Sequence, residues 1–127
     1  MSLFGVLGLA GFCWLAAFQL ALAAGAPLGA LAWGGRFRVL PGRLRWASLA
    51  VAGLAALGVV IVMQITGAGP RILPEIWLRP ALGAFAAVFA MSLFANAASP
   101  SKPERFHGVA LGGTLVLACG GLVFGGG

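Results

Sequence analysis

Four apolar stretches, each close to the length of a membrane-spanning helix, fill most of this chain and leave short connectors between them. About 20 apolar residues in a helix cross a hydrocarbon core of about 30 Å, because each residue adds about 1.5 Å. With 61% hydrophobic and 8% charged residues, the 127-residue chain has too few charges to coat a soluble domain. We therefore predict a single domain with an all-α fold: a four-helix transmembrane bundle with up-down topology and short connectors. The predicted spans are about residues 3–24, 44–66, 75–98 and 102–124.

The first stretch has an alternative interpretation as a secretory signal peptide, because Ala21-Leu22-Ala23 resembles a cleavage site. However, no Lys or Arg precedes the apolar run, and the run is longer than the apolar region of an ordinary signal peptide. These two features favour a retained helix.

The third and fourth stretches carry recognisable helix starts. Pro74 suits a first helical position, whereas Pro80 either kinks the third helix or marks the start of its spanning part. Ser101 and Glu104 match the S-x-x-E capping box, in which each side chain accepts a hydrogen bond from the backbone N–H of the other residue. This helix cap makes the preceding connector very short, so the third and fourth helices should be antiparallel neighbours.

The basic residues predict the orientation of the bundle. Lys and Arg in short connectors favour the cytoplasmic side. Two basic residues, Arg71 and Arg79, lie near the connector between the second and third stretches. The connectors on the opposite side have six, namely Arg36, Arg38, Arg43, Arg45, Lys102 and Arg105. We therefore expect a multi-pass membrane protein with these six residues on the cytoplasmic side and both termini on the outer side.

Composition argues against several functions. The net charge of +6 suggests attraction to anionic headgroups and not nucleic-acid binding, because no soluble basic domain is present to meet a duplex. No charged residue lies in the middle of a predicted span, which disfavours a proton pump or an ion-coupled transporter. His107 cannot supply bis-His haem ligation alone; it could bind one chlorophyll or one metal, or be an interfacial residue. Cys13 and Cys119 lack C-x-x-C spacing and suit small buried hydrophobes. No catalytic residue, cofactor or metal site is predicted.

Uncharged polar side chains inside the apolar stretches are candidate intramembrane contacts. An unpaired amide in hydrocarbon is unfavourable, so Gln19 should face protein and pair with another helix or a ligand. Asn96 and Thr114 are further candidates, whereas Gln64 lies nearer the outer interface, where water can pair with it. Close helix packing is permitted by pairs of small residues four apart, namely Gly83 with Ala87, Gly108 with Gly112, and Ala110 with Thr114.

Five arginines on the predicted cytoplasmic side form a candidate anion site. Guanidinium groups repel one another unless a negative group lies among them, and they match phosphate oxygens in a bidentate fork. We expect membrane lipids with anionic headgroups, or an acidic partner surface, as the counter-ion. The alternative is that these residues only orient the chain. The candidates are Arg36, Arg38, Arg43, Arg45 and Arg105.

Two motifs in the predicted cytoplasmic connectors carry a resemblance. The pattern A-P-x-G, G-G, V-L-P, L-R and S over residues 26–48 resembles an uncharacterised group of small four-span bacterial inner-membrane proteins. The string N-A-A-S-x-S-x-x-E-R over residues 96–105 is similar to a second motif of that group. The resemblance implies bacterial origin and the same topology, and therefore a location in a bacterial cytoplasmic (inner) membrane; it carries no catalytic residues.

The leading functional hypothesis is association, either as an accessory subunit of a membrane complex or as a homo-oligomer. One alternative is an oligomeric transporter or channel for a small or lipid-like solute, which a crevice reaching Gln19 would favour. Another is an enzyme acting on lipid headgroups through Glu104, Ser99 and His107, which a pocket holding Glu104 and His107 together would favour. Outer faces that meet only lipid, with no cavity, would favour association.

Overall fold

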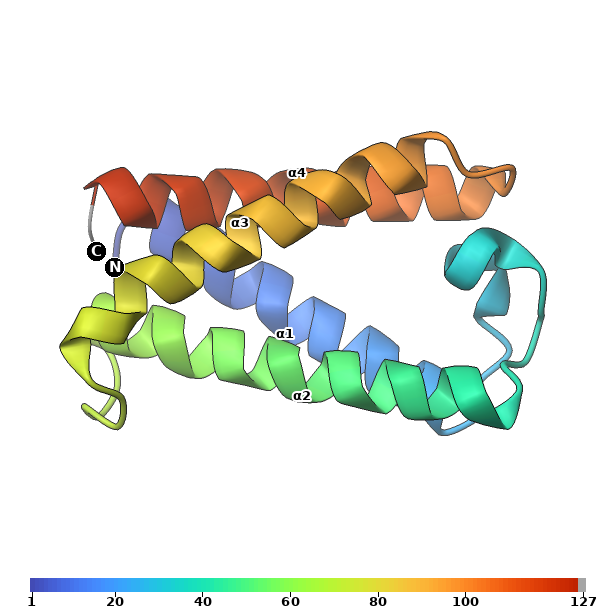
Figure 1. The fold of residues 1–127 in the computed structure, drawn as a ribbon, viewed down its shortest axis with the longest axis horizontal. Helices are drawn as coiled ribbons and strands as arrows, with labels where there is room; N and C mark the ends of the chain where they lie inside the picture. Colours follow the sequence, from blue (N-terminus) through green and yellow to red (C-terminus); the bar gives the residue numbers. More distant parts are fainter. Residues whose placement is uncertain (126–127) are drawn as a thin grey trace.

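The computed structural model describes residues 1–125, which form a bundle of four long α-helices (Figure 1). All four helices are long and apolar enough to cross a membrane, and no strand occurs among the described residues. The predicted all-α architecture is confirmed, and the predicted spans match the helices to within about two residues. The helices are α1 Leu3–Ala23, α2 Gly42–Ile65, α3 Glu75–Ala97 and α4 Lys102–Gly125.

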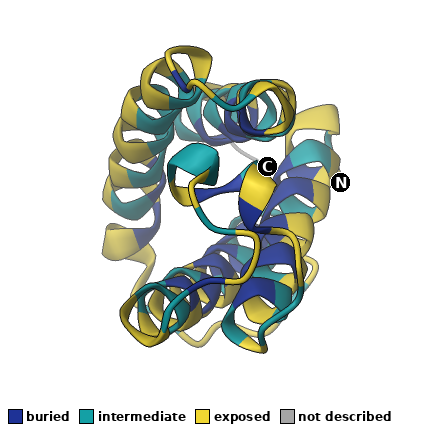
Figure 2. Cartoon of the chain, turned by 90° about the vertical axis from the view of Figure 1, so that its right-hand side faces the viewer, coloured by how far each residue is buried: buried dark blue, intermediate teal, exposed yellow. Residues whose placement is uncertain are grey.

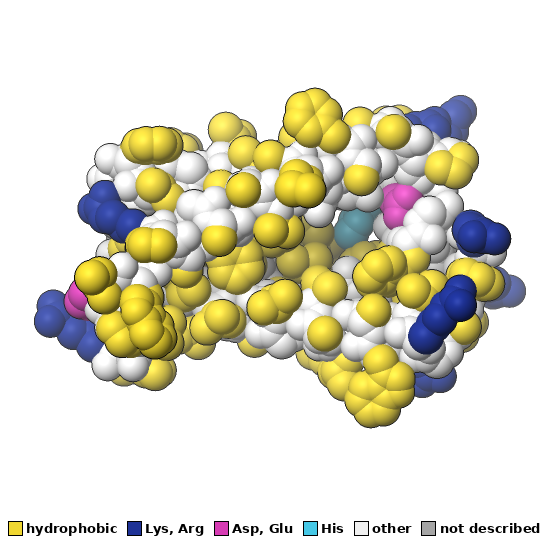
Figure 3. Space-filling model, in the orientation of Figure 1, with side chains coloured by type: hydrophobic (Ala, Val, Ile, Leu, Met, Phe, Trp, Pro, Cys, Tyr) yellow, Lys and Arg dark blue, Asp and Glu magenta, His cyan; other side chains and the backbone are white. Residues whose placement is uncertain are grey.

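The up-down arrangement sorts the connectors onto two ends of the bundle (Figure 1). Connector one (residues 24–41) and connector three (residues 98–101) lie at one end, which we call the basic end. Connector two (residues 66–74) lies at the other end, the terminal end, together with the N-terminus. Blue Lys and Arg side chains accordingly gather at the two ends of the molecule (Figure 3). The side of the membrane that each end faces stays a prediction.

Helix packing is uneven around the bundle. α1 packs along α2, α3 packs along α4, and α1 also packs against α4, whereas α2 and α3 have few contacts and diverge away from connector two (Figure 1). Phe12 of α1 is fully buried and bridges to α3, with its ring centroid 5.0 Å from that of Phe85 and 5.7 Å from that of Phe89. The core is therefore continuous near the middle of the helices but open on the side between α2 and α3.

Small residues permit the close approach of α3 and α4. Gly108 is buried, and a Cβ atom there would overlap the side-chain amide of Asn96. Gly112 is buried beside Leu93 in the same interface. The pair Gly108 and Gly112 thus lies at a helix contact, as expected, whereas Gly83 lies exposed on the outer face of α3.

The predicted helix starts hold in part. Pro74 is the residue that precedes α3, one position earlier than expected, and the helix continues through Pro80. Ser101 lies directly before α4, and its Oγ accepts a hydrogen bond from the Glu104 backbone N–H at 3.4 Å, as predicted. The reciprocal half of the capping box is replaced, because the Ser101 N–H donates to Ser99 Oγ at 3.1 Å.

Candidate functional site

A cavity of about 320 Å³ lies between the four helices, on the side where α2 and α3 diverge. We call it the crevice. Figure 3 shows the hollow between the upper and lower helices, with the colour of the chain's single histidine inside it. All four helices and connector one contribute to its lining. The crevice is thus a gap in the side of the bundle, at a depth where the helices are apolar on their outer faces.

Apolar and polar side chains are segregated along the crevice. Most of the wall is apolar and includes Leu15, Val51, Leu54, Phe85, Val88 and Leu115. The polar lining residues are Gln19, Trp33, Ser92, Asn96 and His107. All five lie in connector one or within about two turns of the basic ends of α1, α3 and α4. The crevice is therefore amphipathic, with its polar end toward the basic end of the bundle.

Gln19 lies in the wall of this crevice. It is 8% exposed, so the expectation that it faces protein is confirmed. The expected partner on another helix is not found, because Oε1 has no hydrogen bond to any residue within 1–125. An unpaired buried carbonyl oxygen carries a desolvation cost of about 1–3 kcal/mol. The other expected partner, a ligand, stays a prediction.

His107 is oriented by a contact that no sequence pattern predicted. Its Nε2 accepts a hydrogen bond from the Trp14 indole N–H at 2.7 Å, and its ring lies against Phe18, with centroids 4.5 Å apart. The indole nitrogen can only donate, so Nε2 carries a lone pair and the neutral ring bears its proton on Nδ1. His107 is therefore a neutral donor in the crevice wall. No group of three or more His, Cys, Asp or Glu able to hold a metal occurs in residues 1–125.

Connector one folds into the basic end of the bundle as two short turns, η1 Gly29–Leu31 and η2 Trp33–Gly35. Figure 2, which looks onto the basic end, shows this segment in the middle of the ring of helices. Trp33, Gly34 and Gly35 have φ angles of 50°, 80° and 71°. Glycine adopts this left-handed region readily, whereas a bulky residue such as Trp33 is strained in it. Contacts with other parts of the chain must therefore stabilise this backbone conformation of Trp33.

Hydrogen bonds to α2 and α4 stabilise this part of connector one. The Trp33 indole N–H donates to Ser48 Oγ of α2 at 2.9 Å, and the Gly34 backbone N–H donates to Glu104 Oε2 of α4 at 3.0 Å. Ser101 Oγ also donates to the Ala30 carbonyl. Ser101 and Glu104, the two residues of the predicted helix cap, thus also form hydrogen bonds with connector one. Glu104 is 6% exposed and does not line the crevice, so it is not brought together with His107 there.

The five candidate arginines all lie at the basic end, but two of them have structural partners. Arg45 Nε donates to the Ala23 carbonyl at 2.8 Å, and Arg105 Nη1 donates to the Ser99 carbonyl at 2.8 Å. These carbonyls lie at or beyond the C-terminal ends of α1 and α3, where the helix itself supplies no donor. The Arg36 guanidinium lies 5.9 Å from the Phe37 ring centroid, and Arg36, Arg38 and Arg43 are exposed. Anion binding by this group stays a prediction.

Two further polar residues differ from expectation. Thr114 makes no contact with another helix through its hydroxyl, which donates to the Ala110 carbonyl of its own helix at 2.8 Å. Such back-bonding satisfies a hydroxyl inside a helix without a tertiary partner. Gln64 was expected to meet water, but it is 6% exposed and binds connector two. The turn after α2 folds back over the amide and removes it from solvent.

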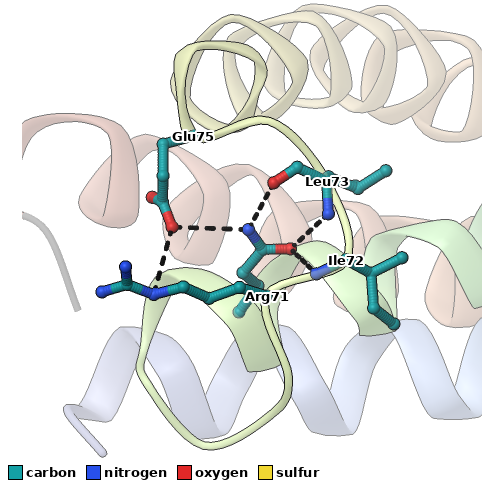
Figure 4. A network of polar contacts seen from close by, with 5 residues as sticks. Arg71, Ile72, Leu73 and Glu75 are labelled. Atoms are coloured by element: carbon teal, nitrogen blue, oxygen red, sulfur yellow. Dashed lines mark hydrogen bonds and ion pairs between the residues drawn. The ribbon is translucent and has the colours of Figure 1, made fainter.

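The contacts of Gln64 form a compact network (Figure 4). Oε1 accepts from the backbone N–H groups of Ile72 and Leu73, at 3.2 and 2.9 Å, and Nε2 donates to the Leu73 carbonyl at 2.7 Å. Nε2 also lies 3.4 Å from Glu75 Oε1, which pairs with Arg71 at 3.7 Å. Gln64 therefore fixes the start of α3 relative to the end of α2, at the place where these helices approach each other.

Comparison of the chain with protein-family models, curated proteins and solved structures gave no match. The resemblance to the small four-span group accordingly stays a prediction.

Proposed function

We propose that this chain is a multi-pass protein of a bacterial cytoplasmic membrane that binds a lipid-like solute in the crevice, as part of a transporter or carrier for that solute. One observation carries the proposal: an amphipathic crevice opens between α2 and α3 and reaches the buried amide of Gln19. Ligand sites are typically concave and mostly apolar, with a few placed polar groups that fix orientation.

The size of the crevice suits part of an amphiphile. A cavity of about 320 Å³ lies at the lower end of the range of about 300–1,000 Å³ for small-molecule sites. It suits a headgroup and the first part of a chain. The side opening between α2 and α3 gives the rest of the chain a path into surrounding lipid, which a closed cavity would not.

The other hypotheses receive less support from the geometry. The enzyme hypothesis needed Glu104 beside His107, but Glu104 accepts from Gly34 and is outside the crevice lining. Association remains a second proposal and rests on one observation. Gly83 is exposed on α3, and a Cβ atom there would meet no other atom within 4 Å. A crosslink between Gly83→Cys copies in native membranes would support a homo-oligomer or a subunit interface at this face.

We also propose that the basic end faces the cytoplasm, with Arg36, Arg38 and Arg43 at the depth of anionic headgroups. The excess of basic residues at this end, six against two, supports the orientation.

Photo-crosslinking tests the crevice directly. The purified protein in nanodiscs is incubated with a long-chain amphiphile that carries a diazirine near its headgroup, and the labelled residues are mapped by mass spectrometry. Ala95 lies exposed in α3 and lines the crevice, so Ala95→Trp should block labelling of crevice residues. Ala87 is also an exposed alanine of α3 but does not line the crevice, so Ala87→Trp is the matched control. Equal labelling of both variants, or labels confined to outer helix faces, would overturn the proposal.

A further inference from the structure

The polar end of the crevice offers only uncharged groups. Among residues 1–125, the lining contains no Lys, Arg, Asp or Glu side chain. His107 is neutral there, because the hydrogen bond from Trp14 requires a lone pair on Nε2. A charged headgroup at this position would lose its hydration without gaining a countercharge, which is strongly unfavourable. The site therefore selects against ionised ligands.

The hydrogen-bonding groups narrow the ligand further. Gln19 is buried as a residue, and its Oε1 is unpaired within residues 1–125. Oε1 is itself buried, so it meets a ligand only when the Gln19 side chain turns toward the crevice, and it then needs a hydrogen-bond donor. His107 Nδ1–H is a donor, and Ser92 and Asn96 can both donate and accept. A group that both donates and accepts, without charge, matches this set best.

We propose that the ligand of the crevice is an uncharged amphiphile with an alcohol headgroup, and that Gln19 and His107 are the residues that bind its hydroxyl. This inference rests on the proposed function and names its ligand class. A hydroxyl can donate to the Gln19 oxygen while it accepts from His107 Nδ1–H. A carboxylate accepts only, and leaves the Gln19 oxygen unpaired. An ammonium donates only, and meets a second donor at His107.

The crevice and the arginines of the basic end therefore prefer different lipids. Arg36, Arg38 and Arg43 are exposed on connector one and at the start of α2, outside the crevice lining. Guanidinium groups there suit phosphate-bearing headgroups. Neutral alcohols have no such preference for that surface, so the two ligand classes can be distinguished by where they label the protein.

A headgroup series tests the inference. The reporter is the full chain in nanodiscs labelled by a photoreactive long-chain alcohol. The competitors share one saturated chain length and end in an alcohol, a carboxylate, an ammonium or a plain methyl group. We expect the alcohol to compete about 10-fold better than the other three competitors. This factor corresponds to the net contribution of one or two hydrogen bonds in a site that excludes most water. An equal or stronger effect of the carboxylate or ammonium would overturn the headgroup assignment. Absence of crevice labelling by any amphiphile would instead overturn the proposed function.

Single substitutions locate the headgroup. Gln19→Leu should reduce the advantage of the alcohol to about 2-fold or less, and His107→Phe should reduce it partly. Thr114→Val is the matched control, because the Thr114 hydroxyl bonds within its own helix and does not line the crevice. Competition by the plain alkane chain reports whether each variant retains a folded crevice. An unchanged alcohol preference in a folded Gln19→Leu variant would overturn the assignment of Gln19.

Discussion

Leucine substitution at the two buried glutamines should change stability in opposite directions. Gln64 makes three hydrogen bonds of 3.2 Å or less to connector two, whereas Gln19 Oε1 has no partner within residues 1–125. Each bond contributes about 0.5–1.5 kcal/mol net, so the three bonds sum to about 1.5–4.5 kcal/mol. Water can reach part of connector two after the substitution, so we expect Gln64→Leu to cost about 2–3 kcal/mol. Gln19→Leu removes a buried unpaired oxygen, and we expect a change between zero and about 2 kcal/mol of added stability.

The assay is reversible unfolding in mixed micelles as the fraction of sodium dodecyl sulfate is raised, followed by far-ultraviolet circular dichroism. The two variants are matched, because both replace a glutamine less than 10% exposed within a helix by the same apolar residue. A cost at Gln64 no larger than that at Gln19 would refute the reasoning. A marked loss of stability in Gln19→Leu would show that this amide has a protein partner after all.

Three further predictions concern the basic end and the orientation of the chain in the membrane. Ser101→Ala should cost about 1–2 kcal/mol in the same unfolding assay and more than Ser2→Ala, because Ser101 both caps α4 and binds Ala30, whereas Ser2 only caps α1. In spheroplasts, a cysteine at Phe37 should react only with membrane-permeant thiol reagents, whereas a cysteine beside Met1 should also react with impermeant reagents. The reverse pattern would show that the predicted topology is inverted. Neutralising the exposed residues Arg36, Arg38 and Arg43 together should weaken retention of phosphatidylglycerol or cardiolipin in native mass spectrometry. Unchanged lipid retention with normal topology would show that these arginines act only as orientation signals.

Features encoded locally in the chain were predictable from the sequence. Helix length and position follow from apolar runs, because an apolar stretch of about 20 residues has few other stable states in a bilayer. The start of α4 was predicted because Ser101 and Glu104 have capping-box spacing, and Ser101 Oγ does accept from the Glu104 backbone N–H. The separation of basic residues onto two ends also follows from the order of helices and connectors alone.

Tertiary contacts were not predictable in the same way. The hydrogen bond from Trp14 to His107 joins residues 93 positions apart, and neither belongs to a motif. Glu104 was expected to bind back to Ser101, but connector one brings the Gly34 N–H within reach and the carboxylate accepts from it instead. Gln64 was assigned to water because its place near a helix end did not reveal that connector two folds back over it. The crevice likewise depends on the angle between α2 and α3, which no local pattern encodes.

The two neighbouring bonds of connector one have a mechanical consequence. Trp33 is tied to α2 and Gly34, the next residue, is tied to α4, so one peptide unit is a cross-tie between the two halves of the bundle. Besides this tie, the halves meet along the seam of α1 with α4, through the Phe12 ring contacts with α3, and at the Gln64 network near connector two. A movement that carried α2 away from α4 would stretch the cross-tie and break one of its two bonds. The tie therefore opposes separation of α2 from α4 and limits how far the gap between α2 and α3 can widen.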